Sequence, residues 1–353
     1  MTVRAIPGEI KVEHSTEKGQ VAGSTRYDWA IIALGTWLMI GGYSDGWAHN
    51  HLPIDNFFTP WHAAFYSGFL VSIIFLVGTF IRNRRRGYSA RLAMPAGYEL
   101  SLLGSIIILF GGVGDMFWHM LFGIELNIDG ALSPTHIAIT IGLALIVSGP
   151  FRAAWQRANA SSQPTLASLL PMLLSLTFTL STITIIMQIF HPFVFAWASD
   201  PTGSNQGLGV ASIVMQTGIL MGFVLLTVRR WMLPFGSLTL VFTLNMIFLS
   251  FMQDHYLLIL VAALAGLTAD LLIRQLKPST TKQLEIHIFG FIVPVVLYLL
   301  YFLALKLTSG IFWTIHLWLG STFLAGIIGS LLSYLLVPPQ IPAEKEVEKK
   351  NIE

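Results

Sequence analysis

Ten apolar segments, each close to the length of a membrane-spanning helix, follow one another along this chain of 353 residues. Because a helix rises about 1.5 Å per residue, about 20 largely apolar residues cross the hydrocarbon core of a bilayer. The chain is 54% hydrophobic and only 11% charged, whereas a soluble domain carries about 25% charged residues. The sequence therefore predicts an all-α, polytopic transmembrane helical bundle. The predicted spans cover residues 27–45, 61–82, 97–119, 134–155, 166–190, 207–229, 234–252, 255–273, 284–305 and 310–337.

Lysine and arginine are divided unevenly between the two sides of these predicted spans. Both residues are enriched in the cytoplasmic loops of membrane proteins. With ten spans, nineteen of the twenty Lys and Arg residues fall on one side, and only Lys306 falls on the other. This predicts a cell-membrane protein with a cytoplasmic segment 1–26, a transmembrane domain 27–337 and a cytoplasmic tail 338–353. The net charge of +2 is too small to indicate binding of nucleic acid.

Two pairs of acidic and histidine residues lie near the opposite, extracytoplasmic ends of the first and third spans. His49 follows Asp45 by four residues, and His119 follows Asp115 at the same distance. Residues at this spacing lie on one face of a helix with their Cβ atoms about 5–6 Å apart. Each pair can therefore share one metal ion. Ionisable groups placed inside a membrane protein indicate a functional site.

A third histidine completes each group. His62 follows Thr59-Pro60, and His136 comes two residues after Ser133-Pro134. Ser or Thr before Pro is typical of the N-cap and first position of a helix, so we expect both histidines in the first turn of the returning helix, facing the Asp/His pair. The predicted metal ligands are Asp45, His49, His62, Asp115, His119 and His136. Neighbours predicted to orient them through hydrogen bonds are His51, Asp55, Glu125 and Asp129.

The two hairpins that carry these groups, 27–82 and 97–155, indicate an internal repeat. We predict five hairpins in all, of which the three over 166–337 have lost the complete ligand set. In the third hairpin Gln216 stands where the third histidine of the first two does. Single histidines elsewhere are more typical of hydrogen bonds between helices than of metal ligands, although they can line a common cavity. They are His191, His255 and His316.

The chain has no cysteine, so any metal site must use nitrogen and oxygen ligands. One Asp with two His leaves open positions that suit copper, non-haem iron or zinc. Copper(II) has the highest affinity of these divalent ions for such ligands. The residues alone leave the choice of metal open.

The segment Asp45–Gly68 resembles the C subunit of particulate methane monooxygenase and ammonia monooxygenase. That family carries an intramembrane Asp-x3-His-x12-His motif that ends in Phe-Thr-Pro-x-His, and Phe58-Thr59-Pro60-Trp61-His62 keeps both the spacing and this context. In the second hairpin His136 comes four residues later than the family spacing. The resemblance implies copper at Asp45, His49 and His62 and oxidation of a small apolar substrate with O2. It also implies other membrane subunits as partners, besides the lipid bilayer that the composition predicts. Because the sequence shows no haem, flavin or iron–sulfur motif, we expect an external electron donor.

Two other classes of function fit the same residues. Repeated hairpins with carboxylate and imidazole groups also suit a metal transporter or a copper-delivery protein, in which weak internal repeats are common. Polar residues farther along the spans, such as Asn245, Asp270 and His287, are few and scattered, which disfavours a relay across the membrane. The third class is a non-catalytic assembly subunit that keeps the metal site for stability.

Overall fold

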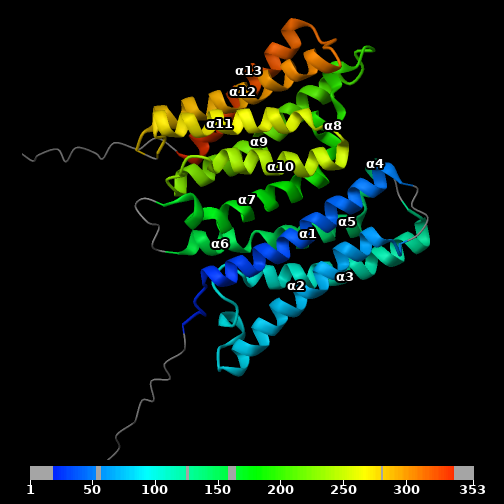
Figure 1. Ribbon diagram of the computed structural model, residues 1–353, viewed down its shortest axis with the longest axis vertical. Coiled ribbons are helices and arrows are strands. Elements are labelled where there is room, and N and C mark those ends of the chain that lie inside the picture. The colour runs from blue at the N-terminus through cyan, green and yellow to red at the C-terminus, as the bar shows by residue number, and fades with distance from the viewer. Residues whose placement is uncertain (1–18, 53–56, 125–126, 158–163, 280, 338–353) are drawn as a thin grey trace, which may run out of the picture.

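A computed structural model describes residues 19–52, 57–124, 127–157, 164–279 and 281–337, and this part of the chain is helical (Figure 1). Most of the predicted N-terminal segment and the whole predicted tail lie outside these residues. The long helices are α1 (Thr25–His51), α2 (Pro60–Arg85), α3 (Glu99–Phe122), α5 (Pro134–Val147), α7 (Leu166–Ile186), α9 (Gln206–Arg230), α10 (Ser237–Gln253), α11 (Leu257–Leu276), α12 (Gln283–Thr308) and α13 (Ile315–Leu336). The shorter ones are η1 (Ala90–Leu92), α4 (Asn127–Leu132), α6 (Gly149–Gln156), η2 (Gln188–Phe190), α8 (Pro192–Phe195) and η3 (Trp197–Ser199).

Seven of the described helices are long and apolar enough to cross a membrane, as in a multi-pass membrane protein. They are α2, α3, α7, α9, α11, α12 and α13. The pair α5 and α6, bent by 41° at their junction, brings the number to eight if it forms one span. Each of the ten predicted segments is thus helical, but α10 is shorter than a typical span, and α1 carries charged residues near both ends.

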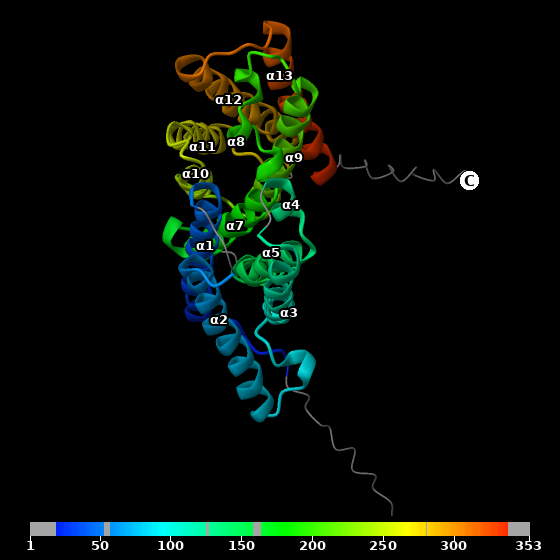
Figure 2. The ribbon, with the colours of Figure 1, turned by 90° about the vertical axis from the view of Figure 1, so that its right-hand side faces the viewer.

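The helices pack in sequential pairs at both ends of the molecule (Figure 1). Helix α1 packs along α2 and α3 along α5, while α10 pairs with α11 and α12 with α13. The third predicted hairpin differs, because α7 packs mainly on α10, and α9 mainly on α13. The connection between α7 and α9 contains η2, α8 and η3, which separates the two helices. Figure 2 shows α7 between the α1–α5 group and the remaining helices.

Small residues let the paired helices of the metal-motif region approach closely. An added Cβ on Gly142 of α5 would lie 2.6 Å from the carbonyl oxygen of Gly104 of α3. On α1, an added Cβ on Gly41 would lie 2.7 Å from the Cα of Phe65 of α2. Packing of this kind is how helices associate within a bilayer, where lipid tails are as apolar as leucine. It fixes the separation of the helix ends that carry the Asp and His residues.

Two buried polar side chains elsewhere in the bundle, Asp270 and Asn245, have partners on neighbouring helices. The Asp270 carboxylate of α11 accepts hydrogen bonds from the backbone N–H groups of Leu238 and Thr239, at 3.0 and 2.9 Å, and so caps the first turn of α10. The Oδ1 atom of Asn245 accepts a hydrogen bond from the Ser181 hydroxyl at 2.7 Å. Both side chains therefore join neighbouring helices.

Candidate metal centre

Helix α1 brings Asp45 and His49 to the same face near its C-terminal end. The His49 Nε2 atom lies 3.8 Å from Asp45 Oδ2. Both side chains are about one-fifth exposed, 19% for His49 and 21% for Asp45. The i, i+4 geometry predicted from the sequence is confirmed for this pair, and its partial exposure gives an ion a way in.

The first turn of α2 holds His62 opposite that pair. Thr59 is the N-cap, its Oγ1 accepts a hydrogen bond from the backbone N–H of His62 at 3.2 Å, and Pro60 occupies the first helical position. The Nδ1 atom of the His62 ring is 2.9 Å from the same hydroxyl oxygen and 3.7 Å from Asp45 Oδ1. The capping geometry predicted from Thr-Pro is confirmed, and it turns the imidazole toward Asp45.

The second hairpin repeats this arrangement in a more enclosed setting. On α3 the His119 Nε2 atom lies 3.6 Å from Asp115 Oδ1, with side-chain exposures of only 1% and 2%. Ser133 caps α5 and Pro134 follows it, so His136 stands in the first turn as His62 does. The His136 Nε2 atom lies 3.2 Å from Asp115 Oδ1.

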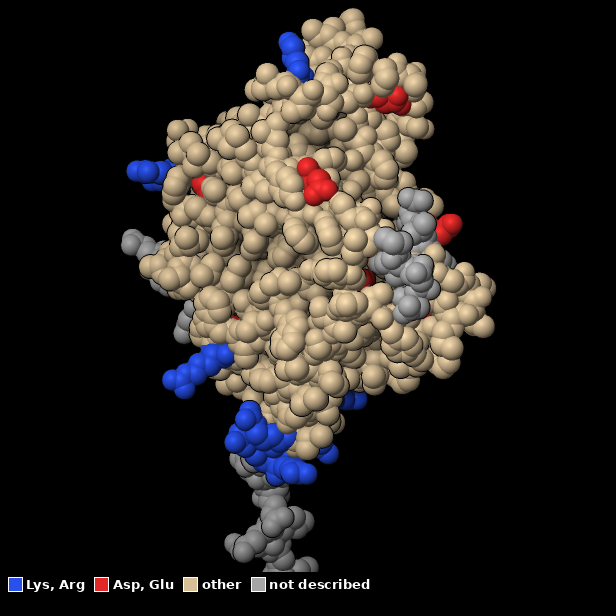
Figure 3. Space-filling view, turned by 45° about the vertical axis from the view of Figure 1, so that its right-hand side comes forward, with Lys and Arg blue, Asp and Glu red and all other residues tan. Residues whose placement is uncertain are grey.

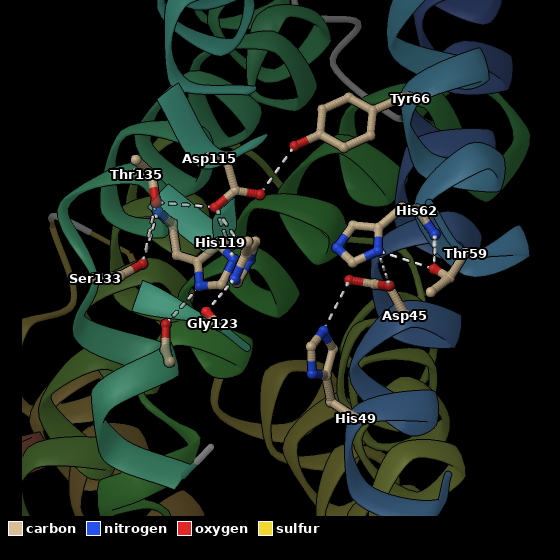
Figure 4. Close-up of polar contacts among 12 residues, drawn as sticks. Asp45, His49, Thr59, His62, Tyr66, Asp115, His119, Gly123, Ser133 and Thr135 are labelled. Carbon is tan, nitrogen blue, oxygen red and sulfur yellow. Dashed lines mark hydrogen bonds and ion pairs between the residues drawn. The ribbon is translucent and has the colours of Figure 1, made fainter. Parts of the chain in front are cut away.

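The ring of His62 joins the two groups. In Figure 4 it lies between Asp45 and Thr59 on one side and Asp115 and His119 on the other. In two groups of three residues, each residue can place one ligand atom within 4.8 Å of the other two. The first group is Asp45, His49 and His62, and the second is His62, Asp115 and His119. Ligands arranged tetrahedrally at about 2.0–2.1 Å from an ion lie about 3.4 Å from one another, so the side chains must close by up to about 1.4 Å to hold one ion. The two sites predicted from the sequence form one cluster.

Backbone carbonyl groups fix the ring nitrogens of two histidines. The Nδ1–H of His119 donates to the Gly123 carbonyl at 3.1 Å, and the Nδ1–H of His136 donates to the Gly130 carbonyl at 2.5 Å. A carbonyl oxygen can only accept, so Nδ1 carries a proton in both rings and Nε2 is left for a cation or a second proton. Within the described residues the buried Nε2 of His119 and Oδ1 of Asp45 have no hydrogen-bond partner. Buried polar atoms are rarely left without a partner, so these two atoms are available to a bound ion or a water molecule.

Two hydroxyl groups hold the Asp115 carboxylate in place. The Thr135 hydroxyl of α5 donates to Oδ1 at 2.9 Å, and the Tyr66 hydroxyl of α2 donates to Oδ2 at 3.2 Å. Groups that donate hydrogen bonds to a metal-binding carboxylate orient it and influence the affinity for the metal. Neither residue was predicted from the sequence. Thr135 could have been identified, because it directly precedes the predicted ligand His136.

An aromatic side chain covers the inner part of the cluster. The Phe57 ring is stacked on His62 with the centroids 4.9 Å apart, and its centroid is 6.2 Å from that of His119. An apolar cover excludes water and lowers the local dielectric, which strengthens every electrostatic contact below it.

The residues predicted to orient the ligands are placed elsewhere or fall outside the described residues. His51 points to the end of α10, where its Nε2 lies 2.6 Å from Asp254 Oδ2, and its Nδ1 lies 2.8 Å from the Trp47 carbonyl oxygen. Asp129 is exposed on α4, whose contribution to the cluster is the Gly130 carbonyl group. Asp55 and Glu125 lie outside the described residues.

The three single histidines lie apart from the cluster. His191 accepts a hydrogen bond from the Phe193 N–H at 3.2 Å and caps α8. The Nδ1–H of His255 donates to the Phe193 carbonyl at 2.7 Å, and His316 is exposed on α13. The hydrogen bonds of His191 and His255 hold the α8 segment in place, which is a structural role.

Comparisons of the chain with protein-family models, with curated proteins and with solved structures found no match. The functional interpretation therefore depends on the geometry of the cluster and on the motif residues themselves.

Proposed function

We propose that this chain is a ten-span membrane metalloprotein with both termini in the cytoplasm and its metal centre near the extracytoplasmic face. The distribution of charge supports this orientation. Figure 3 shows the largest group of basic side chains at one end of the molecule, below a broad surface with few charged side chains. The basic residues in the last turn of α2 are Arg82, Arg84 and Arg85, whereas the ligands of the first hairpin lie at the opposite ends of α1 and α2.

The cluster supports binding of one or two transition-metal ions, and copper is the metal we propose. The observation that carries the proposal is the position of His62, which completes both groups of ligands. Two carboxylates and four imidazoles offer oxygen and nitrogen donors, which suit copper(II) and also non-haem iron or zinc. In the described part of the chain neither Asp45 nor Asp115 is paired with Lys or Arg, so a cation would balance their charge.

For the activity we propose oxidation of a small apolar substrate that arrives through the bilayer. A bound copper ion would supply the redox chemistry that activates O2. The chain's own residues would hold the ligands through Thr135 and Tyr66 and exclude water through Phe57. One oxygen atom would enter a C–H bond of the substrate, and an external donor would supply the electrons and protons that reduce the other atom to water. Other membrane subunits would connect this chain to that donor.

Transport or delivery of a metal is the second candidate, and the graded exposure of the cluster favours it. Asp45 and His49 are partly exposed, whereas Asp115 and His119 are buried, so an ion could move inward between them. Continuation across the bilayer would need further polar groups. Those that the sequence offers hold helices together instead: Asp270 caps α10, and the Nδ1 atom of His287 lies 2.6 Å from the Ser333 hydroxyl. A non-catalytic assembly subunit is the third candidate.

Metal analysis of the purified protein tests the proposal. We expect copper in the wild-type protein and in His316→Ala, a matched control on α13, and loss of copper in His62→Ala. Supplied with a reductant and O2, the copper-loaded protein should convert a short alkane such as propane to an alcohol. Copper without product would indicate delivery or assembly. Wild-type protein that takes up no transition metal would overturn the proposal.

A further inference from the structure

A groove opens between α1 and α2 at the end of the helices opposite the metal centre. Its volume is about 620 Å³, within the range of about 300–1,000 Å³ that is usual for small-molecule sites. Its lining comes from the first turns of α1 and the last turns of α2, and the two helices can be followed in Figures 1 and 2. The lining residues are Ser24, Arg26, Tyr27, Ala30, Ile74, Phe75, Gly78, Thr79 and Arg82.

The groove exists because the contact between α1 and α2 loosens along their length. Near the metal centre an added Cβ on Gly41 would lie 2.7 Å from the Cα of Phe65, and one on Gly68 would lie 2.8 Å from the Trp37 ring. At Gly78, farther along α2, an added Cβ would meet no atom within 4 Å. The helices are therefore in close contact at one end and leave open space at the other.

Two arginines at the mouth of the groove have no anionic partner among the described residues. Arg26 and Arg82 both line it, and neither forms an ion pair with a described carboxylate. The nearest acidic residue in sequence, Asp28, is buried and already bound by Arg157, whose Nη2 lies 2.7 Å from Asp28 Oδ2. A guanidinium group presents N–H donors in a planar fork that matches the oxygen atoms of a phosphate group.

Below the arginines the wall of the groove is apolar. Ile74 is 63% exposed, and the Phe75 ring packs against the Tyr27 ring with the centroids 5.1 Å apart. Ile74 precedes Arg82 by eight residues, which is about 12 Å along a helix. The apolar wall therefore continues from the charged mouth toward the middle of the membrane, which is the order of groups in a phospholipid.

We propose that this groove binds an anionic phospholipid, with the phosphate between Arg26 and Arg82 and an acyl chain along Ile74 and Phe75. Two unpaired cations favour a headgroup with net negative charge over a zwitterionic one. The apolar wall favours a lipid over free phosphate, which would leave Ile74 and Phe75 exposed. The site is independent of the metal centre and of the proposed oxidation.

Native mass spectrometry of the purified protein with defined lipids tests this site. We expect phosphatidylglycerol to bind more tightly than phosphatidylcholine and glycerophosphate not to displace it. In Arg26→Ala/Arg82→Ala, affinity for phosphatidylglycerol should fall about 30-fold, about fivefold for each arginine lost near the headgroups. The matched control is Arg84→Ala/Arg85→Ala, which removes the same charge from the same end of α2 outside the groove and should lower affinity less than the groove variant does.

A second variant tests the apolar part of the groove without altering charge. Gly78→Leu should fill the open space and lower lipid affinity, whereas Gly320→Leu on α13, where an added Cβ also meets no atom within 4 Å, should not. Both substitutions add a side chain where there is room, so we expect both proteins to fold. Equal losses in the two double-arginine variants, equal binding of the two lipids, or unchanged binding by Gly78→Leu would each overturn the proposal.

Discussion

The crossing of α3 and α5 at Gly104 and Gly142 should control the geometry of the inner half of the metal centre. We predict that Gly142→Ala weakens both the fold and the metal centre. The added methyl group would lie 2.6 Å from the Gly104 carbonyl oxygen and 2.5 Å from Ile108 Cγ1. Favourable carbon contacts lie at about 3.5–4.0 Å, so the two helices must separate by about 1 Å.

The cost follows from two opposing terms. Overpacking of a closely packed contact costs about 1–3 kcal/mol, and replacing Gly by Ala within a helix stabilises it by about 1 kcal/mol. We expect a net destabilisation of about 0–2 kcal/mol, at the upper end because the clash is with backbone. Because His136 lies six residues before Gly142 on α5, the displacement should lengthen the contact from its Nε2 to Asp115 Oδ1, now 3.2 Å. We expect metal affinity to fall about tenfold.

Thermal unfolding in detergent and chelator competition measure these two effects. The control is Gly218→Ala on α9, where an added Cβ meets no atom within 4 Å, so stability should hold or rise and metal affinity should not change. If Gly142→Ala and Gly218→Ala gave the same unfolding temperature and the same metal affinity, the close crossing would not position His136. That result would refute the reasoning.

Three further substitutions test other parts of the structure. Thr135→Val removes a donor to Asp115 and should lower metal affinity about 10–100-fold in chelator competition; unchanged affinity would contradict the role of its hydroxyl group. Arg157→Ala leaves the buried Asp28 side chain with only the Tyr98 hydroxyl among the described residues and should cost about 1–3 kcal/mol in thermal unfolding, since Arg157 is partly exposed. Hydrogen bonds from Ser204 and Thr202 hold the pKa of Asp200 below its usual value, so its contribution to stability is present above about pH 3.9 and is lost as pH falls through the folded-state pKa. Asp200→Asn should therefore lose less stability than the wild-type protein in melting curves recorded as pH falls below about 4. Equal losses in the two proteins would contradict a stabilising role of the Asp200 carboxylate.

The local geometry of the site could be predicted from the sequence because it depends on spacing within single helices. Asp45 and His49, four residues apart on α1, lie on one face as expected. The Thr59-Pro60 signal places His62 in the first turn of α2, because a residue at the N-cap can accept a hydrogen bond from the third residue of the helix. Each of these features involves only a few consecutive residues.

Contacts between the hairpins could not be predicted in the same way. The approach of His62 to Asp115 and His119 depends on how α2 packs on α3, and the hydrogen bond from Tyr66 to Asp115 joins residues 49 positions apart. His51 was predicted to orient the metal ligands, but in the structure it contacts Asp254 instead. Its position two residues after His49 already indicated a different direction on the helix, but its partner Asp254 is 203 positions away, so the sequence could not show which group His51 contacts. Periodicity gives the face of a helix but not the neighbour that this face meets.

The charge of the Asp/His cluster determines whether it binds protons or a metal ion. Asp115 is 1% exposed, and an ionised carboxylate is buried only when it is paired or bound to a cation. Its nearest groups that can carry positive charge are His119 and His136. Their Nδ1–H groups already donate hydrogen bonds to backbone carbonyls, so a proton or a metal ion at Nε2 would supply the charge that pairs with an ionised Asp115. The two differ in one measurable respect, because binding of a metal expels protons and therefore weakens as pH falls. Proton release on addition of copper, lost in His62→Ala, would assign that charge to the metal.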